Sequence, residues 1–277
     1  DLVRIAIRVE GDRVAEASFA ASGCGAASAA ASAAIGLVSG APVLEAAKIG
    51  TGDVAAELGG LSAGKIHAAE LAADALARAL GGAVAASAQL EEAPGRILIA
   101  MSGGVDSAVA AHLCADRAEE APVAVTLELW RDEQNDAEGS CCSASAVQRA
   151  RSLAHSLGLA HLTLDLREAF RAGVVEPWIA GHAAGKTPNP CVRCNGAVRL
   201  DAMLDLATRL GAAELATGHY ARVGNDGLLR AAADPAKDQS YMLAALAPRS
   251  VARMLFPLGE MTKPEVRQVA AHAGLSV

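Results

Sequence analysis

The stretch that decides the fold is residues 96–107, which read RILIAMSGGVDS. Its first six residues are mostly apolar, as in a short buried strand, and residues 102–106 form a glycine-rich turn. Residues 107–117 then predict a helix. A strand, a glycine-rich turn and a helix in this order form a phosphate cradle, because glycines let backbone N–H groups approach an anion and the helix N-terminus favours negative charge. The carboxylate of Asp106 could hold a Mg²⁺ ion there.

Strands and helices continue to alternate downstream of this stretch. We expect strands at 122–130, 162–166 and 214–217, and helices at 144–157 and 203–210. This alternation predicts an α/β fold with a doubly wound, mostly parallel sheet. After Gly227 the pattern loosens into a helical segment at 240–254.

The region before the stretch has a different pattern. Residues 2–9 and 14–19 alternate as in a hairpin, and residues 26–38 and 65–80 predict helices, the second ended by Gly81-Gly82. This is a small α+β domain. The expected organisation is therefore a first domain, a linker, a catalytic domain and the start of a further domain, at residues 1–84, 85–94, 95–226 and 227–277.

Composition narrows the class of protein. The chain has 277 residues, of which 52% are hydrophobic, and this excludes a disordered chain. No apolar run approaches the roughly 20 residues of a membrane span, and no signal peptide is visible, so we expect a cytoplasmic protein without a membrane partner. Six cysteines in such a chain favour metal, redox or catalytic roles over disulfides.

The charge is unevenly distributed. The net charge of −7 argues by itself against a polyanionic partner. Residues 193–277, however, carry 10 basic and 8 acidic side chains. The mildly basic end removes the objection to a nucleic acid.

Two cysteines stand in residues 187–195, which read TPNPCVRCN. We expect the prolines to stiffen a loop that presents both thiols one turn apart, and Arg193 to favour the thiolate of Cys194. By itself, a Cys-x-x-Cys pair is ambiguous between half a zinc site, a redox pair and an iron–sulfur site. Cys141-Cys142 could complete a four-cysteine zinc site.

Five motifs in order identify a family. They are SGGVDS, TPNPCVRCN, ATGHYAR, KDQSY and FPLG, at residues 102–107, 187–195, 216–222, 237–241 and 256–259. Together they resemble the MnmA family of tRNA-specific 2-thiouridylases over roughly residues 95–277. The resemblance implies a PP-loop fold of the adenine nucleotide alpha hydrolase type. It also implies an enzyme that uses ATP to insert sulfur at C2 of the wobble uridine in the tRNA anticodon loop.

The resemblance also implies residue roles. Cys194 matches the nucleophile. The ATP-binding positions match Ala100, Met101, Ser102, Gly103, Gly104, Val105, Asp106, Ser107, Leu127 and Gly218. The tRNA-contacting positions match Asn189, Pro190, Cys191, Lys237, Asp238 and Gln239.

The source of sulfur is left open between two mechanisms. In the family, a second cysteine carries a persulfide, and we expect it, with a C-terminal β-barrel, beyond residue 277. Some members are proposed instead to hold a 4Fe-4S cluster, for which Cys191, Cys194 and a downstream cysteine could supply the ligands. The donor would be a cysteine desulfurase or sulfide.

Residues 1–84 resemble a second family, the IscU/NifU-N iron–sulfur scaffolds. Asp1, Cys24 and His67 match its metal ligands, whereas Ala68 stands where a further cysteine belongs. Another cysteine of the family would fall just before Asp1. The domain is either a degenerate metal site or a docking unit.

Two alternative functions remain. An iron–sulfur scaffold or sulfur carrier without tRNA chemistry would not use ATP. Another PP-loop ligase would use ATP but would not need the paired thiols of residues 187–195.

Overall fold

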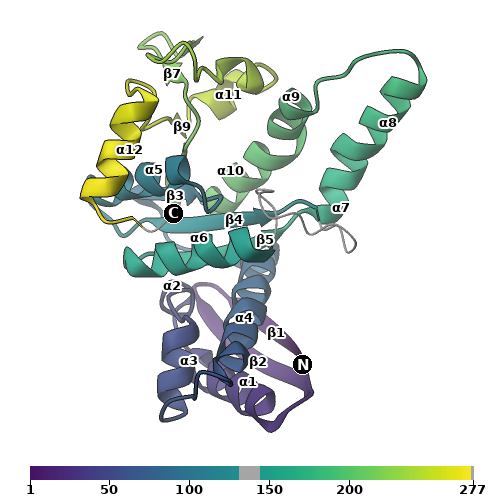
Figure 1. The fold of residues 1–277 in the computed structure, drawn as a ribbon, viewed down its shortest axis with the longest axis vertical. Helices are drawn as coiled ribbons and strands as arrows, with labels where there is room; N and C mark the ends of the chain where they lie inside the picture. The colour runs from purple at the N-terminus through teal and green to yellow at the C-terminus, as the bar shows by residue number, and fades with distance from the viewer. Residues whose placement is uncertain (131–143, 276–277) are drawn as a thin grey trace.

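The computed structural model describes residues 1–130 and 144–275. Within these residues a five-stranded sheet has the order β5-β4-β3-β6-β9, and every neighbouring pair is parallel (Figure 1). Its strands are β3 (Ala93–Ala100), β4 (Val123–Glu128), β5 (Ala160–Asp165), β6 (Ala212–Thr217) and β9 (Met254–Leu255). The predicted α/β fold with a doubly wound sheet is confirmed.

Both faces of this sheet are covered. Helices α5 (Val105–Ala115) and α6 (Ala144–Ser156) pack on one face, where Ala108, Ala111 and Ala150 meet Ile99 and Ala124. Helix α10 (Leu200–Arg209) packs on the other face. Every residue of β4 is buried, which explains why its sequence, VAVTLE, is mostly apolar and does not alternate with polar residues.

The N-terminal region is a small α+β unit. It comprises β1 (Leu2–Glu10), β2 (Arg13–Ser22), α1 (Gly25–Val38), α2 (Val43–Ala46), α3 (Thr51–Glu57) and α4 (Ile66–Ser87). Strands β1 and β2 form an antiparallel hairpin, and only one face of β1 is shielded from solvent, so its residues alternate in burial.

Helix α4 is longer than the sequence predicts. The prediction that Gly81-Gly82 ends this helix is wrong, because the helix continues to Ser87. A Cβ atom at Gly81 would lie 1.9 Å from the carbonyl oxygen of Thr163 in β5. Gly81 therefore lets the helix approach the edge of the five-stranded sheet.

This approach joins the two parts of the chain in one hydrophobic core. The first half of α4 packs against α1 and α3 through Ala68, Ala69 and Ala72. Its second half contributes Leu76 and Leu80 to a cluster that also holds residues of β3, β4 and β5. Full burial of a leucine stabilises the fold by about 1.5–3 kcal/mol. The predicted domain boundaries at residues 84 and 94 remain predictions.

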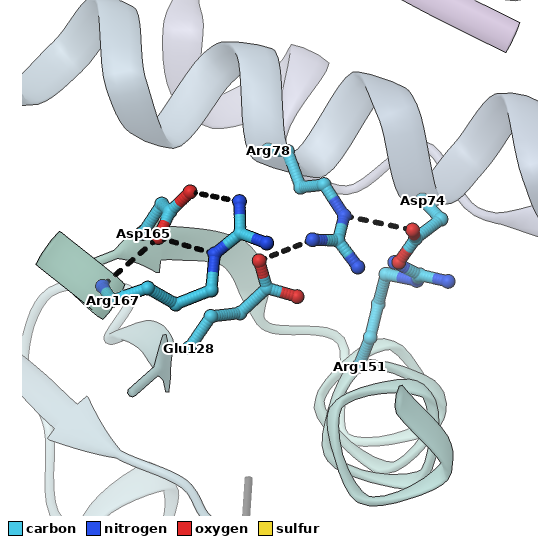
Figure 2. A network of polar contacts seen from close by, with 6 residues as sticks. All are labelled: Asp74, Arg78, Glu128, Arg151, Asp165 and Arg167. Carbon is cyan, nitrogen blue, oxygen red and sulfur yellow. Dashed lines mark hydrogen bonds and ion pairs between the residues drawn. The ribbon is translucent and has the colours of Figure 1, made fainter. Parts of the chain in front are cut away.

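Ion pairs flank this core (Figure 2). The Arg78 guanidinium of α4 donates to Asp74 on its own helix, at 2.8 Å, and to Glu128 at the end of β4. Arg151 of α6, which is 4% exposed, donates to the other oxygen of Asp74 at 2.9 Å. Burial acts to raise the pKa of Asp74, but the two guanidiniums hold this pKa below its usual value. Burial raises the pKa of Glu128.

An arm extends from the sheet after β5 (Figure 1). It contains α7 (Arg167–Phe170), the π-helix η1 (Arg171–Val175), α8 (Glu176–Ala183), α9 (Pro190–Cys194) and the π-helix η2 (Asn195–Arg199), which leads into α10. The pair of thiols predicted on a loop thus lies on a helix.

The segment after β6 is mostly irregular. It contains β7 (Arg222–Val223), β8 (Leu229–Arg230), the 3-10 helix η3 (Ser240–Leu243), α11 (Pro248–Val251) and α12 (Lys263–His272). The single helical segment predicted at 240–254 is wrong. Pro248 starts a new helix and cannot continue a preceding one, because it has no N–H to donate. No helix in the described part of the chain is long and apolar enough to cross a membrane.

The two adjacent glycines of α4 provide a matched test of this packing. We expect Gly81→Ala to lower the free energy of unfolding by roughly 2 kcal/mol or more, because its Cβ atom would overlap a backbone carbonyl. Gly82→Ala has open space around its Cβ atom and should raise the free energy of unfolding by about 0.5–1 kcal/mol through helix propensity. Urea denaturation measures both. Equal effects of the two substitutions would contradict the close approach of α4 to β5.

Candidate functional site

The glycine-rich turn lies between β3 and α5. Gly103 has a φ of +77°, and a Cβ atom there would lie 2.5 Å from the carbonyl oxygen of Ala146. Gly104 is the N-cap of α5. The Ser107 hydroxyl accepts from the backbone N–H of Ser102 at 3.1 Å and donates to the carbonyl of Gly104 at 2.9 Å. The turn is thus closed on itself, with the first N–H groups of α5 at its mouth, as anion binding requires.

A cavity of about 220 Å³ opens beside this turn. It lies at the carboxyl ends of β3, β4 and β6, where the chain order of the sheet reverses and ligands of doubly wound folds bind. Its walls are formed by Ala100, Met101, Ser102, Asp106, Ser107, Val125, Leu127, Leu129, Arg199, Leu200, Met203, Thr217, Gly218, His219 and Gln239.

The walls are divided between apolar and polar groups. Val125, Leu127, Leu129, Leu200 and Met203 provide apolar side chains of a kind that accommodates a flat ring. The serines of the turn, the ends of β6 and α5, and Arg199 provide polar groups. A ligand with an aromatic ring at one end and an anion at the other fits such a cavity.

The carboxylate of Asp106 already has two partners. Its Oδ1 accepts from the hydroxyl of Tyr220 at 2.9 Å and from the ammonium of Lys263 at 2.6 Å. Burial raises the pKa of Tyr220, and its hydrogen bond to Asp106 raises it further. Among the described residues, Oδ2 accepts no hydrogen bond, so this oxygen is the one that suits a hard cation such as Mg²⁺.

The end of β6 contacts the turn directly. A Cβ atom at Gly218 would lie 2.9 Å from the backbone nitrogen of Ser107. Next to it, His219 shares a hydrogen bond of 2.9 Å between its Nδ1 and the hydroxyl of Thr217. Burial, and then the charge of Arg199, lower the pKa of His219 to about 4. His219 is therefore neutral at pH 7.

The two thiols of residues 187–195 lie outside the cavity wall. Asn189 caps α9, because its Oδ1 accepts from the N–H groups of Cys191 and Val192 at 2.9 and 3.3 Å. Cys191 is exposed and Cys194 is buried. The Arg193 guanidinium donates to the carbonyl of Gly173, so the structure directs this cation to the backbone of η1.

The helix that carries Cys194 nevertheless reaches the cavity. Helix α9 continues through η2 into α10, and Arg199, Leu200 and Met203 of this continuous segment line the wall. Cys141 and Cys142, which we considered as zinc ligands, lie outside the described residues.

The three residues of the predicted tRNA-contacting stretch at 237–239 have different positions in the structure. Lys237 is exposed. Asp238 accepts from the N–H of Ala232 at 2.9 Å and from the Ser240 hydroxyl at 2.9 Å, so it stabilises its own turn. Gln239 lines the cavity. The structure thus brings Gln239 to the positions predicted for ATP.

A second cluster lies in the N-terminal unit. Ligand atoms of Asp1, Cys24 and His67 lie within 4.8 Å of one another. Asp1 Oδ2 is 3.0 Å from His67 Nε2 and accepts from the Cys24 thiol at 3.4 Å. The backbone N–H of Ala27 lowers the pKa of Cys24, since Cys24 is the N-cap of α1. Carboxylate, thiolate and imidazole together suit a zinc or iron ion.

Several residues of the site were not predicted. Arg199, Met203 and Lys263 lacked a local signal, because each reaches the site from a distant segment. His219 and Tyr220 belong to the motif at 216–222, so the sequence drew attention to them without giving them a role. Of the predicted ATP-binding residues, Ala100, Met101, Ser102, Asp106, Ser107, Leu127 and Gly218 do line the cavity.

The fold and this site define a PP-loop protein of the α/β class, and comparisons with known proteins agree. Residues 95–277 match the family described as tRNA methyl transferase HUP domain, and residues 1–85 match the NifU-like N terminal domain. The chain belongs to the MnmA family, with a NifU-like domain at its N-terminus.

Two relatives illustrate this membership. The chain is 45% identical over its whole length to the bifunctional protein NifU/MnmA of Rubrobacter xylanophilus, of which it covers 59%. Over 65% of its length it is 44% identical to the tRNA-specific 2-thiouridylase MnmA of Heliobacterium modesticaldum, of which it covers 48%. The chain therefore spans about half the length of these relatives.

A solved structure is more distant. The U34-tRNA thiolase NcsA from Methanococcus maripaludis, determined with its [4Fe-4S] cluster, is 18% identical over 67% of this chain and 58% of its own, with a TM-score of 0.42. At that score the likeness carries no argument about the site.

The protonation of His219 can be measured directly. We expect its ring resonances to titrate near pH 4 in the folded protein, because burial disfavours the imidazolium, and near pH 6.5 in urea. Between these values the unfolded chain binds more protons at His219, so this residue makes the free energy of unfolding rise with pH in that window. NMR of the folded protein and of His219→Gln assigns the signal. A folded midpoint near 6.5 would contradict the buried neutral ring.

Proposed function

We propose that the protein is an ATP-dependent tRNA 2-thiouridylase, which replaces the C2 oxygen of a wobble uridine with sulfur. One observation carries the proposal. The helix that bears Cys194 continues into the wall of the cavity beside the phosphate-binding turn. A nucleotide in that cavity and a thiol on that helix would serve the two halves of one reaction. The relatives named as tRNA-specific 2-thiouridylases support the same activity.

ATP would bind with its phosphates at residues 102–107 and its adenine between Leu127 and Gly218. The N–H groups of the turn and of the α5 N-terminus favour the pyrophosphate, and Asp106 Oδ2 would hold Mg²⁺ on it. Lys263 supplies a further positive charge at this carboxylate. These groups would stabilise pyrophosphate as it leaves.

The reaction would proceed in two steps. The uridine, turned out of the anticodon loop, presents its C2 oxygen to the α-phosphorus of ATP, and pyrophosphate departs. Sulfur then attacks C2, and AMP leaves with the former C2 oxygen. We assign the sulfur nucleophile to Cys194. Asn189, Pro190, Cys191 and the stretch at 237–239 would contact the tRNA.

The sulfur reaches C2 from a persulfide on Cys194 or from a 4Fe-4S cluster. By the persulfide route, the outer sulfur displaces AMP from C2, and a second thiol then attacks the Cys194 sulfur, so that 2-thiouridine is released and a disulfide remains. Cys191 and Cys194 stand three residues apart on α9 and would hold two corners of such a cluster. A bound cluster would supply an iron that takes up sulfide. We propose a cysteine desulfurase as the donor for the persulfide route, because its own persulfide transfers sulfane sulfur, and sulfide as the donor for the cluster route. The cytoplasm is the proposed location.

Substitution of the cysteines tests this function. We expect Cys194→Ala to abolish 2-thiouridine formation while tRNA-dependent release of pyrophosphate continues, because the thiol is needed only for the second step. Cys114→Ala is the matched control. Burial raises the pKa of Cys114 to about 11, so its thiol is not a nucleophile, and thiolation should remain. The readout is nucleoside mass spectrometry after anaerobic incubation with tRNA, ATP and either sulfide or a cysteine desulfurase with cysteine.

Iron analysis of the same samples separates the two sulfur sources. A cluster gives visible iron–sulfur absorbance that Cys194→Ala removes, whereas an iron-free protein that is active with the desulfurase and cysteine supports the persulfide. Thiolation by Cys194→Ala at the rate of the unsubstituted protein would contradict the proposed role of this cysteine. Absence of ATP-dependent pyrophosphate release would favour a sulfur carrier without tRNA chemistry.

We further propose that Asp1, Cys24 and His67 bind a divalent metal ion. Co²⁺ should give thiolate charge-transfer absorption that Cys24→Ser removes and Cys191→Ser retains, because the lowered pKa of Cys24 favours a thiolate ligand. Ultraviolet–visible titration measures it. A spectrum unchanged by Cys24→Ser would show that the cluster of side chains only stabilises the end of α1.

A further inference from the structure

Arg199 is a cation of the cavity wall. It lines the cavity, and its Nε is buried with no hydrogen-bond partner among the residues that the structure describes. Within the described residues, its guanidinium also makes no ion pair. Burying a guanidinium N–H without an acceptor is costly, so such a group in a cavity wall indicates a missing acceptor.

The described residues that line the cavity with Arg199 include a single acidic side chain. Asp106 is the one carboxylate among the described residues that line the cavity, and Lys263 lies 2.6 Å from it. His219 also lines the cavity, and it is neutral because burial, and then the charge of Arg199, lower its pKa. The cavity therefore has positive charge available for a ligand.

The position of Arg199 in the helix is unusual. It is the last residue of the π-helix η2 and follows Cys194 by five residues. A π-helix closes its hydrogen bonds between residues i and i+5, as between the carbonyl of Asn195 and the N–H of Leu200, so residues five apart lie on one side of it. This register places Arg199 on the same side of the helix as Cys194, and Arg199 lines the cavity.

We propose that Arg199 binds a phosphate oxyanion of the nucleotide, the α-phosphate that stays on the adenylated uridine. The proposal rests on the proposed function. The N–H groups of residues 102–107 serve the departing pyrophosphate, and Arg199 reaches the cavity from the helix of Cys194. The phosphate that would lie between this turn and Arg199 is the α-phosphate. A guanidinium presents a planar set of donors to two of its oxygens and would stabilise AMP as it leaves.

The experiment compares ligands with and without that phosphate. Isothermal titration calorimetry measures the affinities of adenosine, AMP and ATP for the unsubstituted protein and for Arg199→Met. We expect Arg199→Met to weaken AMP and ATP by tenfold or more, and adenosine by less than twofold, because a charge-assisted hydrogen bond is lost. Arg199→Lys should recover part of the affinity for AMP.

Controls separate the proposal from other roles. Arg209→Met removes an exposed cation of the same helix and should change none of the three affinities. Arg199→Gln is measured in parallel, so that a folding defect in the methionine variant does not decide the result. Equal weakening of adenosine and AMP would overturn the proposal in favour of a packing role. Weaker tRNA binding with unchanged AMP binding would assign Arg199 to an RNA phosphate instead.

Failure of this inference and failure of the proposed function would give different results. If the unsubstituted protein binds ATP and Arg199→Met binds it equally well, the inference is wrong and the proposed function stands. If the unsubstituted protein binds neither ATP nor AMP, both are wrong.

Discussion

The contact between helix α4 and strand β5 is the constraint on which the arrangement of the chain depends. Gly81 lacks the Cβ atom that would collide with the carbonyl of Thr163, and Leu76 and Leu80 follow the helix into the core beneath the sheet. The N-terminal unit thereby becomes part of the packing of the PP-loop fold. The ion pairs of Arg78 with Glu128 and of Arg151 with Asp74 fix the orientation of the helix, since each joins α4 to a different element (Figure 2).

Strand β4 connects the packing of α4 with the cavity, because residues at its end contact both. Glu128 faces Arg78 of α4, whereas its neighbours Leu127 and Leu129 line the cavity. Because side chains alternate along a strand, a single strand end faces both the N-terminal unit and the nucleotide site. The NifU-like unit and the cavity are thus adjacent through one strand, and the fusion of the two families in one chain has a structural counterpart.

Positive charge is concentrated where the proposed chemistry needs it, despite the acidic total. Lys263 reaches Asp106 from α12, and Arg199 reaches the cavity from η2. Both belong to residues 193–277, whose basic excess the sequence already indicated. The sequence could not show that Lys263 meets the phosphate-binding turn, because 157 positions separate it from Asp106.

The sequence by itself determined the α/β class, the phosphate-binding turn and seven of the fifteen residues of the cavity wall, because these depend on local periodicity and on motifs that are contiguous in the chain. It also identified Asp1, Cys24 and His67, which the structure brings within 4.8 Å. Only the tertiary structure decided that Gly81 continues a helix, that Gln239 lines the cavity, and that Arg193 turns to the carbonyl of Gly173. In each of these cases a distant segment supplies the contact, and local pattern carries no information about distant contacts.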